Sequence, residues 1–394
     1  MQPGRQFDLL VHDMKGREPD SYGLICSKHD GQSGDIDGRM VYYKYNDNHS
    51  QVEFAFALPL QVPLKGEQFV SFNTYQPSLD SKDAANPVAN WIQISNTSSK
   101  QQKGTLYFYS IDGKQLGTDI SVTLGAGARR DISGHQFGAS RVGLVRWRPD
   151  DSTAEFQLRN VRYVYDNNQG LNHFTTAFQL EGLKGSGELL SAPLDTKDGS
   201  SIVELLNTSR EAIKVATMVY NNSGHLLRSM DIKLNAHASF HLITDQILNG
   251  EEGIVMLKSN VANSLIATVM QYGRTPSAGI NYMYGILAKP AVGSMMRGTY
   301  NTFLDQGCNL LLTNPGESKQ DVKVSMVRYD GKKPVSDFSV QVPAHGMYNQ
   351  NICSKDSPNV YGVVTVTPNK SNSIYATIVR LGKNNEYRFP TLVR

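Results

Sequence analysis

The chain has 394 residues, 39% hydrophobic and 19% charged, so it is expected to fold and to divide into roughly two to four domains. Its formal net charge of +3 is spread thinly, without a run of five like charges, which disfavours nucleic acid as a partner. The longest apolar runs, such as 54–60, are far shorter than the roughly 20 residues of a membrane-spanning helix, so no membrane insertion is expected.

The stretch from Gly23 to Tyr43 contains three aspartates, Asp30, Asp35 and Asp37, between glycines. Acidic side chains at alternate positions can supply oxygen ligands to calcium, so these three are weak candidate calcium ligands. Their spacing does not fit an EF-hand loop, and equivalent positions later in the chain carry ordinary turn residues. A solvated turn is therefore the favoured interpretation.

A unit of about 110 residues repeats along the chain. Three segments that begin at Trp91, Ile202 and Leu310 align without gaps through their first halves. In each segment an asparagine stands 17 residues before a turn glycine; the pairs are Asn96 and Gly113, Asn207 and Gly224, and Asn314 and Gly331. The second halves are marked at regular spacing by Ala126, Ala236 and Ala344, and then by Gly143, Gly253 and Gly362.

Each unit contains short runs rich in Val, Ile, Tyr, Phe and Thr, separated by Gly, Asn, Asp and Pro, and no segment keeps a helical period. This pattern predicts an all-β chain of tandem antiparallel, immunoglobulin-like β-sandwich domains. The Cys-Trp-Cys signature of antibody domains is absent. We expect half a sandwich repeat over 1–50 and three repeats over 51–166, 167–274 and 275–394.

Residues 1–50 match only the second half of the repeat, because Gly23 and Tyr43 are spaced as Gly143 and Tyr163 are. Half a sandwich leaves one sheet face uncovered and its edge strands unpaired. Three completions are open: an upstream segment of a longer protein, packing against the neighbouring module, or a strand from another copy of the chain. The last would produce self-association through the incomplete N-terminal repeat.

Two arginines, Arg146 and Arg148, alternate with Val145 and Trp147, so their guanidinium groups should share one face of a strand. Arginine suits carboxylate and phosphate ligands, which makes Arg146, Trp147 and Arg148 candidate contacts for an acidic glycan or lipid head group. The alternative is a charged outer face paired with the acidic residues interspersed among them.

Two histidines, His237 and His241, would lie roughly 13 Å apart on a strand, too far to share one metal ion. His345 occupies the same turn as His237, so we interpret the recurring histidine as an exposed turn residue. Asn96, Asn207 and Asn221 satisfy the N-glycosylation pattern, but we interpret them first as turn formers.

Cys308 and Cys353 lie 45 residues apart in the last repeat. A disulfide between them would stabilise that module by roughly 4 kcal/mol if the compartment is oxidising. Buried free thiols are the alternative, and Cys26 has no obvious partner.

The repeat, with its Asn, Tyr-x-x-x-Gly, Leu-x-Ala-His and Gly-x-Val-x-Val markers, resembles the tandem immunoglobulin-like β-sandwich modules of bacterial surface and secreted proteins. It is more distantly similar to the soluble transducer of microbial sensory rhodopsins. The resemblance implies an extracellular, cell-surface or periplasmic location, with no catalytic residues and no cofactor. The first residues show no signal peptide, so this location follows from the resemblance alone.

No nucleophile elbow, metalloprotease, phosphate-loop or dinucleotide motif occurs, so we do not expect an enzyme. We expect a structural or interaction protein, a rod of modules for adhesion or assembly, with a protein or glycan partner at a cell surface. The alternative is a carbohydrate-binding array in which aromatic rings stack on sugars; its candidates are Trp91, Trp147, Tyr163 and Tyr165.

Overall fold

The computed structural model describes residues 6–11, 14, 23–32, 35–75, 88–165, 174–273, 280–292, 295–332, 334–371, 373–383 and 387–393. It is nearly all β, with 59% of residues in strands and 4% in helices, which confirms the predicted class of tandem antiparallel β-sandwiches. None of the helices in the described part of the chain has the length and apolar character needed to cross a bilayer.

Three units repeat one topology of two packed antiparallel sheets, each sheet with its strands in the same order. The outer sheets run β4 (Gln68–Asn73), β9 (Val142–Pro149), β6 (Gln102–Ser110), β7 (Gln115–Leu124); β12 (Leu190–Asp195), β17 (Glu252–Ser259), β14 (Ile213–Asn221), β15 (Leu226–Leu234); and β20 (Met296–Asn301), β25 (Tyr361–Pro368), β22 (Gln320–Arg328), β23 (Pro334–Val342).

The inner sheets run β11 (Phe174–Glu181), β10 (Glu155–Tyr165), β5 (Val88–Asn96), β8 (Arg129–Ser133); β19 (Met283–Leu287), β18 (Leu265–Gly273), β13 (Gly199–Asn207), β16 (Ser239–Ile243); and β27 (Arg388–Leu392), β26 (Tyr375–Leu381), β21 (Gly307–Thr313), β24 (Met347–Asn351). The short β3 (Leu64–Lys65) also pairs with β10. One α-helix, α1 (Asp245–Leu248), and short 3-10 turns interrupt the described strands.

The N-terminal part contributes one hairpin, β1 (Arg39–Tyr45) and β2 (Val52–Pro59), which corresponds to β10–β11, β18–β19 and β26–β27. We call this part, residues 6–59 where described, the fourth position. The expected boundaries at 50/51, 166/167 and 274/275 are wrong, because each cuts such a hairpin. Repetition in a sequence gives the length of a unit but not the residue at which the unit begins.

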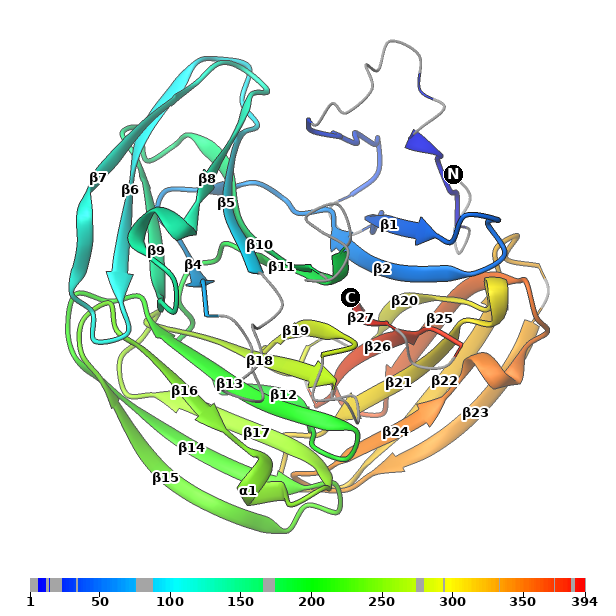
Figure 1. Ribbon diagram of the computed structural model, residues 1–394. Helices are drawn as coiled ribbons and strands as arrows, with labels where there is room; N and C mark the ends of the chain where they lie inside the picture. Colours follow the sequence, from blue (N-terminus) through cyan, green and yellow to red (C-terminus); the bar gives the residue numbers. More distant parts are fainter. Residues whose placement is uncertain are drawn as a thin grey trace.

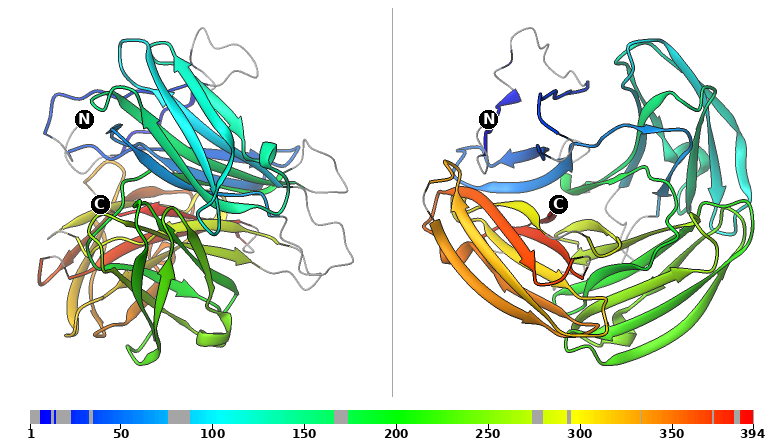
Figure 2. Two further views of the ribbon diagram at one scale, coloured as in Figure 1. Left: turned by 90° about the vertical axis from the view of Figure 1, so that its left-hand side faces the viewer. Right: turned by 180° about the vertical axis from the view of Figure 1, so that it is seen from behind.

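The units form a ring around a common centre, where β2, β11, β19 and β27 come together (Figure 1). Each of these strands contacts the next, and β27 contacts β2 to complete the circle. Figure 2 shows the ring from the side and from behind. The prediction of a rod is therefore wrong: the last strand of every unit faces its neighbours across the centre, which curves the row of units.

The recurring asparagines hold the two sheets of each unit together. Asn96, Asn207 and Asn314 are fully buried, and each side-chain amide donates hydrogen bonds to three backbone carbonyls. Two of those carbonyls lie 27–29 residues further along the chain, at the end of the outer-sheet hairpin. Because the amide nitrogen is enclosed and engaged, Asn96 and Asn207 act as structural clamps rather than glycan acceptors.

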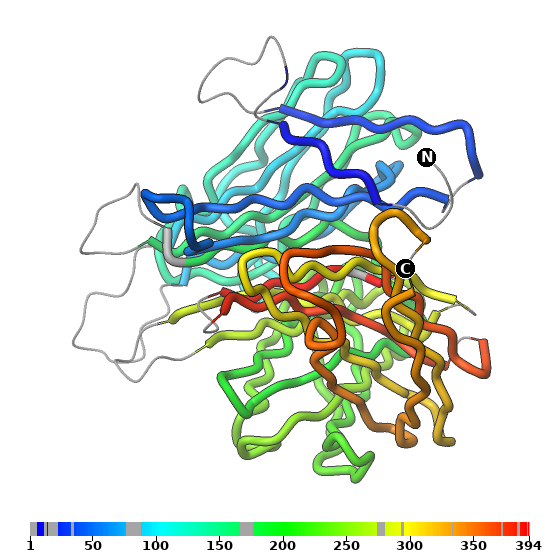
Figure 3. The backbone as a smooth tube through the Cα atoms, turned by 90° about the vertical axis from the view of Figure 1, so that its right-hand side faces the viewer, coloured from blue at the N-terminus to red at the C-terminus, as the bar shows by residue number. Residues whose placement is uncertain are grey.

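Each outer hairpin docks on a turn of the next unit. In the first contact, the Ser239 amide donates to the Ile111 carbonyl at 2.9 Å, and in the second, the Met347 amide donates to the Asn222 carbonyl at 3.0 Å. The same bond joins the Gln6 amide to the Tyr329 carbonyl at 3.2 Å, which places the N-terminal residues against the third unit (Figure 3). Each acceptor stands two residues before a turn glycine, Gly113, Gly224 or Gly331, so the contact to Gln6 repeats the other two and the fourth position occupies a place in the ring.

Candidate functional site

The structure places the predicted ligand contacts of the first unit inside the fold. Trp147 is fully buried and packs against the Phe156 ring, with 4.9 Å between ring centroids. The prediction that Trp147 contacts a ligand is therefore wrong, because its side chain lies in the hydrophobic core of the first unit. Of the other aromatic candidates, Trp91 is exposed, whereas Tyr163 and Tyr165 are partly buried.

The two arginines of β9 do share a face, as their alternation predicts, but their environments differ. Arg146 is buried, and its guanidinium group forms an ion pair with Glu67 and lies over the Tyr107 ring. Arg148 is exposed and lies over the same ring, 5.1 Å from its centroid. Arg146 is thus already engaged by the protein, and Arg148 is left as the exposed member of the pair.

The aspartates of the first segment do not form a metal site in the structure. The Asp35 carboxylate accepts a hydrogen bond from the Gln32 amide at 2.6 Å, and Asp37 lies 3.8 Å from the Arg39 guanidinium group. Across the residues that the structure describes, no three His, Cys, Asp or Glu side chains gather closely enough to hold a metal ion. The calcium interpretation of Asp30, Asp35 and Asp37 is not supported.

Cys308 and Cys353 form a disulfide whose Cα atoms lie 5.2 Å apart. The bond joins the start of β21 to the short helix that follows β24, and both cysteines are buried in the core of the third unit. Cys26 is an exposed free cysteine in the fourth position.

The recurring histidines are turn residues, with φ of 55° at His237 and 51° at His345, but they are not exposed as predicted. His237 is buried against the Tyr109 ring of the previous unit, and His345 stacks on Tyr220 in the same way at 4.8 Å. Burial, together with the nearby Arg146, lowers the pKa of His237. The histidines are contacts between units, which sequence spacing alone does not reveal.

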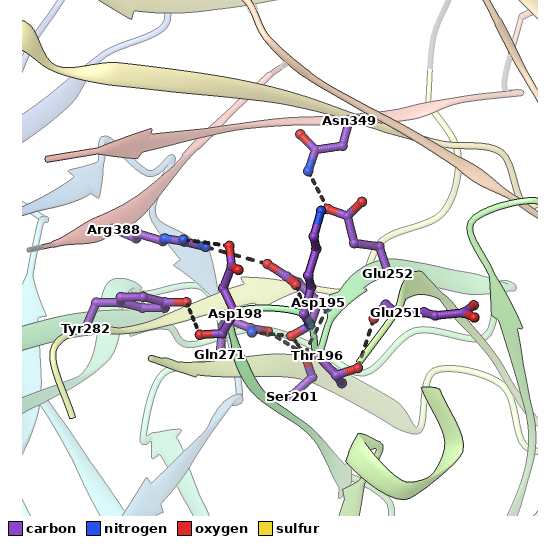
Figure 4. A network of polar contacts seen from close by, with 11 residues as sticks. Asp195, Thr196, Asp198, Ser201, Glu251, Glu252, Gln271, Tyr282, Asn349 and Arg388 are labelled. Carbon is purple, nitrogen blue, oxygen red and sulfur yellow. Dashed lines mark hydrogen bonds and ion pairs between the residues drawn. The ribbon is translucent and has the colours of Figure 1, made fainter. Parts of the chain in front are cut away.

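A polar network joins the second and third units (Figure 4). Arg388 of β27 lies 3.6 Å from the Asp195 carboxylate and 3.0 Å from Asp198, and its guanidinium group sits 4.5 Å from the centroid of the Tyr282 ring. The Asn349 amide of the third unit donates to Glu252 of the second. Every one of these contacts crosses from one unit to the other.

Two carboxyl groups of this network have perturbed acidity. Burial raises the pKa of Asp195 and of Glu252, which face each other across β12 and β17. Raised carboxyl pKa values occur in catalytic sites, but they also occur in structural networks. The adjoining cavity of about 20 Å³ has room for about one water molecule, so the network fastens units together and does not enclose a substrate.

A second cavity, of about 80 Å³, lies where the central strands meet. Its lining is mainly apolar and comes from all four places in the ring, with members that include Ala57, Leu180, Ile286 and Pro390. Arg39 also lines it, and burial together with the neighbouring Arg380 lowers the pKa of Arg39 to about 10. The described lining contains no arrangement of nucleophile and base.

The most distinctive surface is the apolar face left open at the fourth position. Met40 and Ile25 are 37% and 42% exposed, whereas their counterparts in the three complete units are at most 1% exposed. Those counterparts are Asn160, Val269 and Ile378 for Met40, and Val145, Val255 and Val364 for Ile25. Tyr42 is 40% exposed at a position that is otherwise buried. We call Ile25, Met40 and Tyr42 the open face.

No family model matches the chain, and no curated protein matches it. Among solved structures, it is similar to a calcium-binding mutant of β-glucuronidase 2 from Bacteroides uniformis, with 12% identity and a TM-score of 0.12. The match covers 71% of this chain and 34% of that one, so the chain spans about a third of the length of the enzyme. A likeness at this TM-score supports no conclusion about fold or activity.

Proposed function

We propose that the chain is a non-catalytic structural and interaction protein, acting in adhesion or assembly at a cell surface. The observation that carries the proposal is the open face, where apolar side chains meet solvent at positions that are buried three times elsewhere in the same chain. Exposed apolar surface beside an unpaired strand edge is typical of a site of protein association.

Two further features support this proposal. The polar clusters with unusual chemistry, such as Arg388 with Asp195, bridge units instead of lining a cleft of substrate size. The Cys308–Cys353 disulfide fits a protein exported to an oxidising compartment. A protein partner suits the open face better than a glycan does, because a strand edge offers backbone hydrogen bonds in a fixed register.

The test is sedimentation equilibrium over a wide concentration range. The wild-type chain is expected to associate, and Met40→Lys is expected to shift it toward the monomer because a charge enters the apolar face. Leu226→Lys is the matched control, since Leu226 is an exposed leucine on β15, away from the open face.

One pair of results would contradict the proposal. The chain would remain monomeric at every concentration, and a glycan array would give reproducible hits that Trp91→Ala removes. That outcome would favour the carbohydrate-binding alternative, because Trp91 is an exposed aromatic residue on β5.

A further inference from the structure

We infer that the open face binds a segment carrying the first half of this same repeat: one strand equivalent to β13, followed by a hairpin equivalent to β14–β15. The inference rests on the proposed function, because it names the partner of the same surface. Its support comes from the three complete units, which show what covers each part of the unit.

The first support is the pairing of the inner sheets. β10 lies between β11 and β5, β18 between β19 and β13, and β26 between β27 and β21. β1 pairs with β2 on one edge, and among the described residues no strand pairs with its other edge. A strand added there restores the arrangement seen in all three complete units.

The complete units also fix the register of the added strand. The residues that correspond to Met40 are Asn160, Val269 and Ile378, and they pair with Ile92, Val203 and Leu310. All three of these partners are apolar and fully buried. The incoming strand is therefore expected to run antiparallel to β1 and to place a branched or long aliphatic side chain opposite Met40.

The second support is the docking of the hairpins. The described residues form three hairpin contacts, with acceptor carbonyls at Ile111, Asn222 and Tyr329. The corresponding turn of the first unit, near Gly127, has the same left-handed backbone, but an added Cβ at Gly127 would meet no atom within 4 Å. The equivalent residues His237 and His345 instead pack on a tyrosine of the previous unit.

The two supports point to one partner. Within the part of the chain that the structure describes, the strand edge of β1 lacks a β13-like neighbour, and the first unit lacks a β14–β15-like hairpin on its turn. One continuous segment with the order strand, strand, Gly turn, strand supplies both, as residues 199–234 do in the second unit.

The experiment uses the full chain as receptor and a synthetic fragment of residues 199–234 as probe. An environment-sensitive dye on Cys26, the exposed free cysteine of the fourth position, reports occupation of the site. Saturable one-to-one binding is expected, with protection of the β1 amides from hydrogen exchange. The fragment variant Val203→Lys should bind at least about tenfold more weakly, because it places a charge opposite Met40.

Receptor variants complete the test. Met40→Lys and Ile25→Lys should each weaken binding about tenfold or more, and Ile25 lies outside the β1–β2 hairpin, so its variant leaves that hairpin intact. Leu226→Lys in the receptor should leave binding unchanged. A fragment carrying Gly224→Ala should also bind more weakly, because its turn would no longer fit against the turn of the first unit.

Failure of binding, or binding that Met40→Lys and Ile25→Lys leave unchanged, would overturn the inference. If the wild-type chain still self-associates through Met40 under those conditions, the proposed function stands and the occupant is a second copy. If the fragment binds while the chain alone stays monomeric, the inference stands.

Discussion

The turn glycine Gly224 offers a direct test of the docking between units. Its φ is +87°, and an added Cβ would lie 2.0 Å from the Ala344 carbonyl oxygen of the third unit. Gly250 provides a matched control in the same unit, with a φ of +83° and no atom within 4 Å of an added Cβ. Both substitutions, Gly224→Ala and Gly250→Ala, therefore carry the cost of a left-handed alanine backbone. Only Gly224→Ala also creates a steric clash with the third unit.

The expected magnitudes follow from this geometry. A left-handed alanine costs ~1 kcal/mol at either position. At Gly224 the clash must also separate the two units, which loses the bond from the Met347 amide to the Asn222 carbonyl, worth ~1 kcal/mol. The stacking of His345 on Tyr220 contributes about 1 kcal/mol more. Gly224→Ala should thus cost about 3 kcal/mol and Gly250→Ala about 1 kcal/mol.

Two measurements check this reasoning. Urea denaturation followed by circular dichroism gives the free energy of unfolding for each variant. Hydrogen exchange at the Met347 amide should rise roughly thirtyfold in Gly224→Ala, the equivalent of about 2 kcal/mol, and stay unchanged in Gly250→Ala. Equal costs for the two variants, with equal exchange at Met347, would show that the hairpin contact does not hold the units together.

Three further predictions concern the interior of the units. Asn207→Ala should lower the free energy of unfolding by about 3 kcal/mol, because three backbone carbonyls lose a buried donor; a loss below about 1 kcal/mol in thermal unfolding would refute the clamp. Replacing Cys308 and Cys353 by serine should destabilise the third unit by about 4 kcal/mol in urea, whereas Cys26→Ser should have no effect. The raised pKa of Glu252 means that the folded state holds this proton to higher pH than the unfolded state, so its contribution to stability falls as the pH rises above 4.5. Glu252→Gln should remove that part of the pH dependence, and an unchanged stability profile between about pH 4 and about pH 8 would contradict it.

The repeat and its strands could be predicted because they rest on local requirements. Asn96 and its counterparts recur because each unit needs the same buried amide. The turn glycines recur because their backbone is left-handed, with φ of 82° at Gly113 and 68° at Gly331. Such constraints involve one unit at a time, so they leave evenly spaced residues in the sequence.

The ring and the contacts between units could not be predicted, because they join residues distant in sequence. Arg388 lies 190 residues from Asp198, and nothing in the spacing of either residue indicates the pair. The error at Trp147 has a different cause. Its side chain lies on the face of β9 opposite the two arginines and packs against Phe156 in the core of its own unit, and alternation alone does not tell which of the two faces is buried.

The sequence predicted that the N-terminal unit is incomplete, but it did not show which residues form the open face. The half repeat at residues 1–50 predicted uncovered strands, and the structure locates one at β1, which pairs only with β2 among the described strands. The three completions considered from the sequence are not equivalent in the ring. Packing against the neighbouring module occurs through β2 and β11, yet Met40 and Ile25 remain exposed.

The ring also explains why the fourth position matters for the whole molecule. The central strands already form a closed circle, but the outer hairpins make three such contacts among the described residues, and none of these covers the turn at Gly127. In an open row of hairpin contacts, losing one contact separates the units on either side of it. In a closed cycle, each unit still contacts a neighbour on its other side. A strand and hairpin bound at the open face would convert the row into a cycle. Binding of the 199–234 fragment should therefore reduce the loss in free energy of unfolding that Gly224→Ala causes. A fragment that contacted only an isolated surface patch would not produce this coupling.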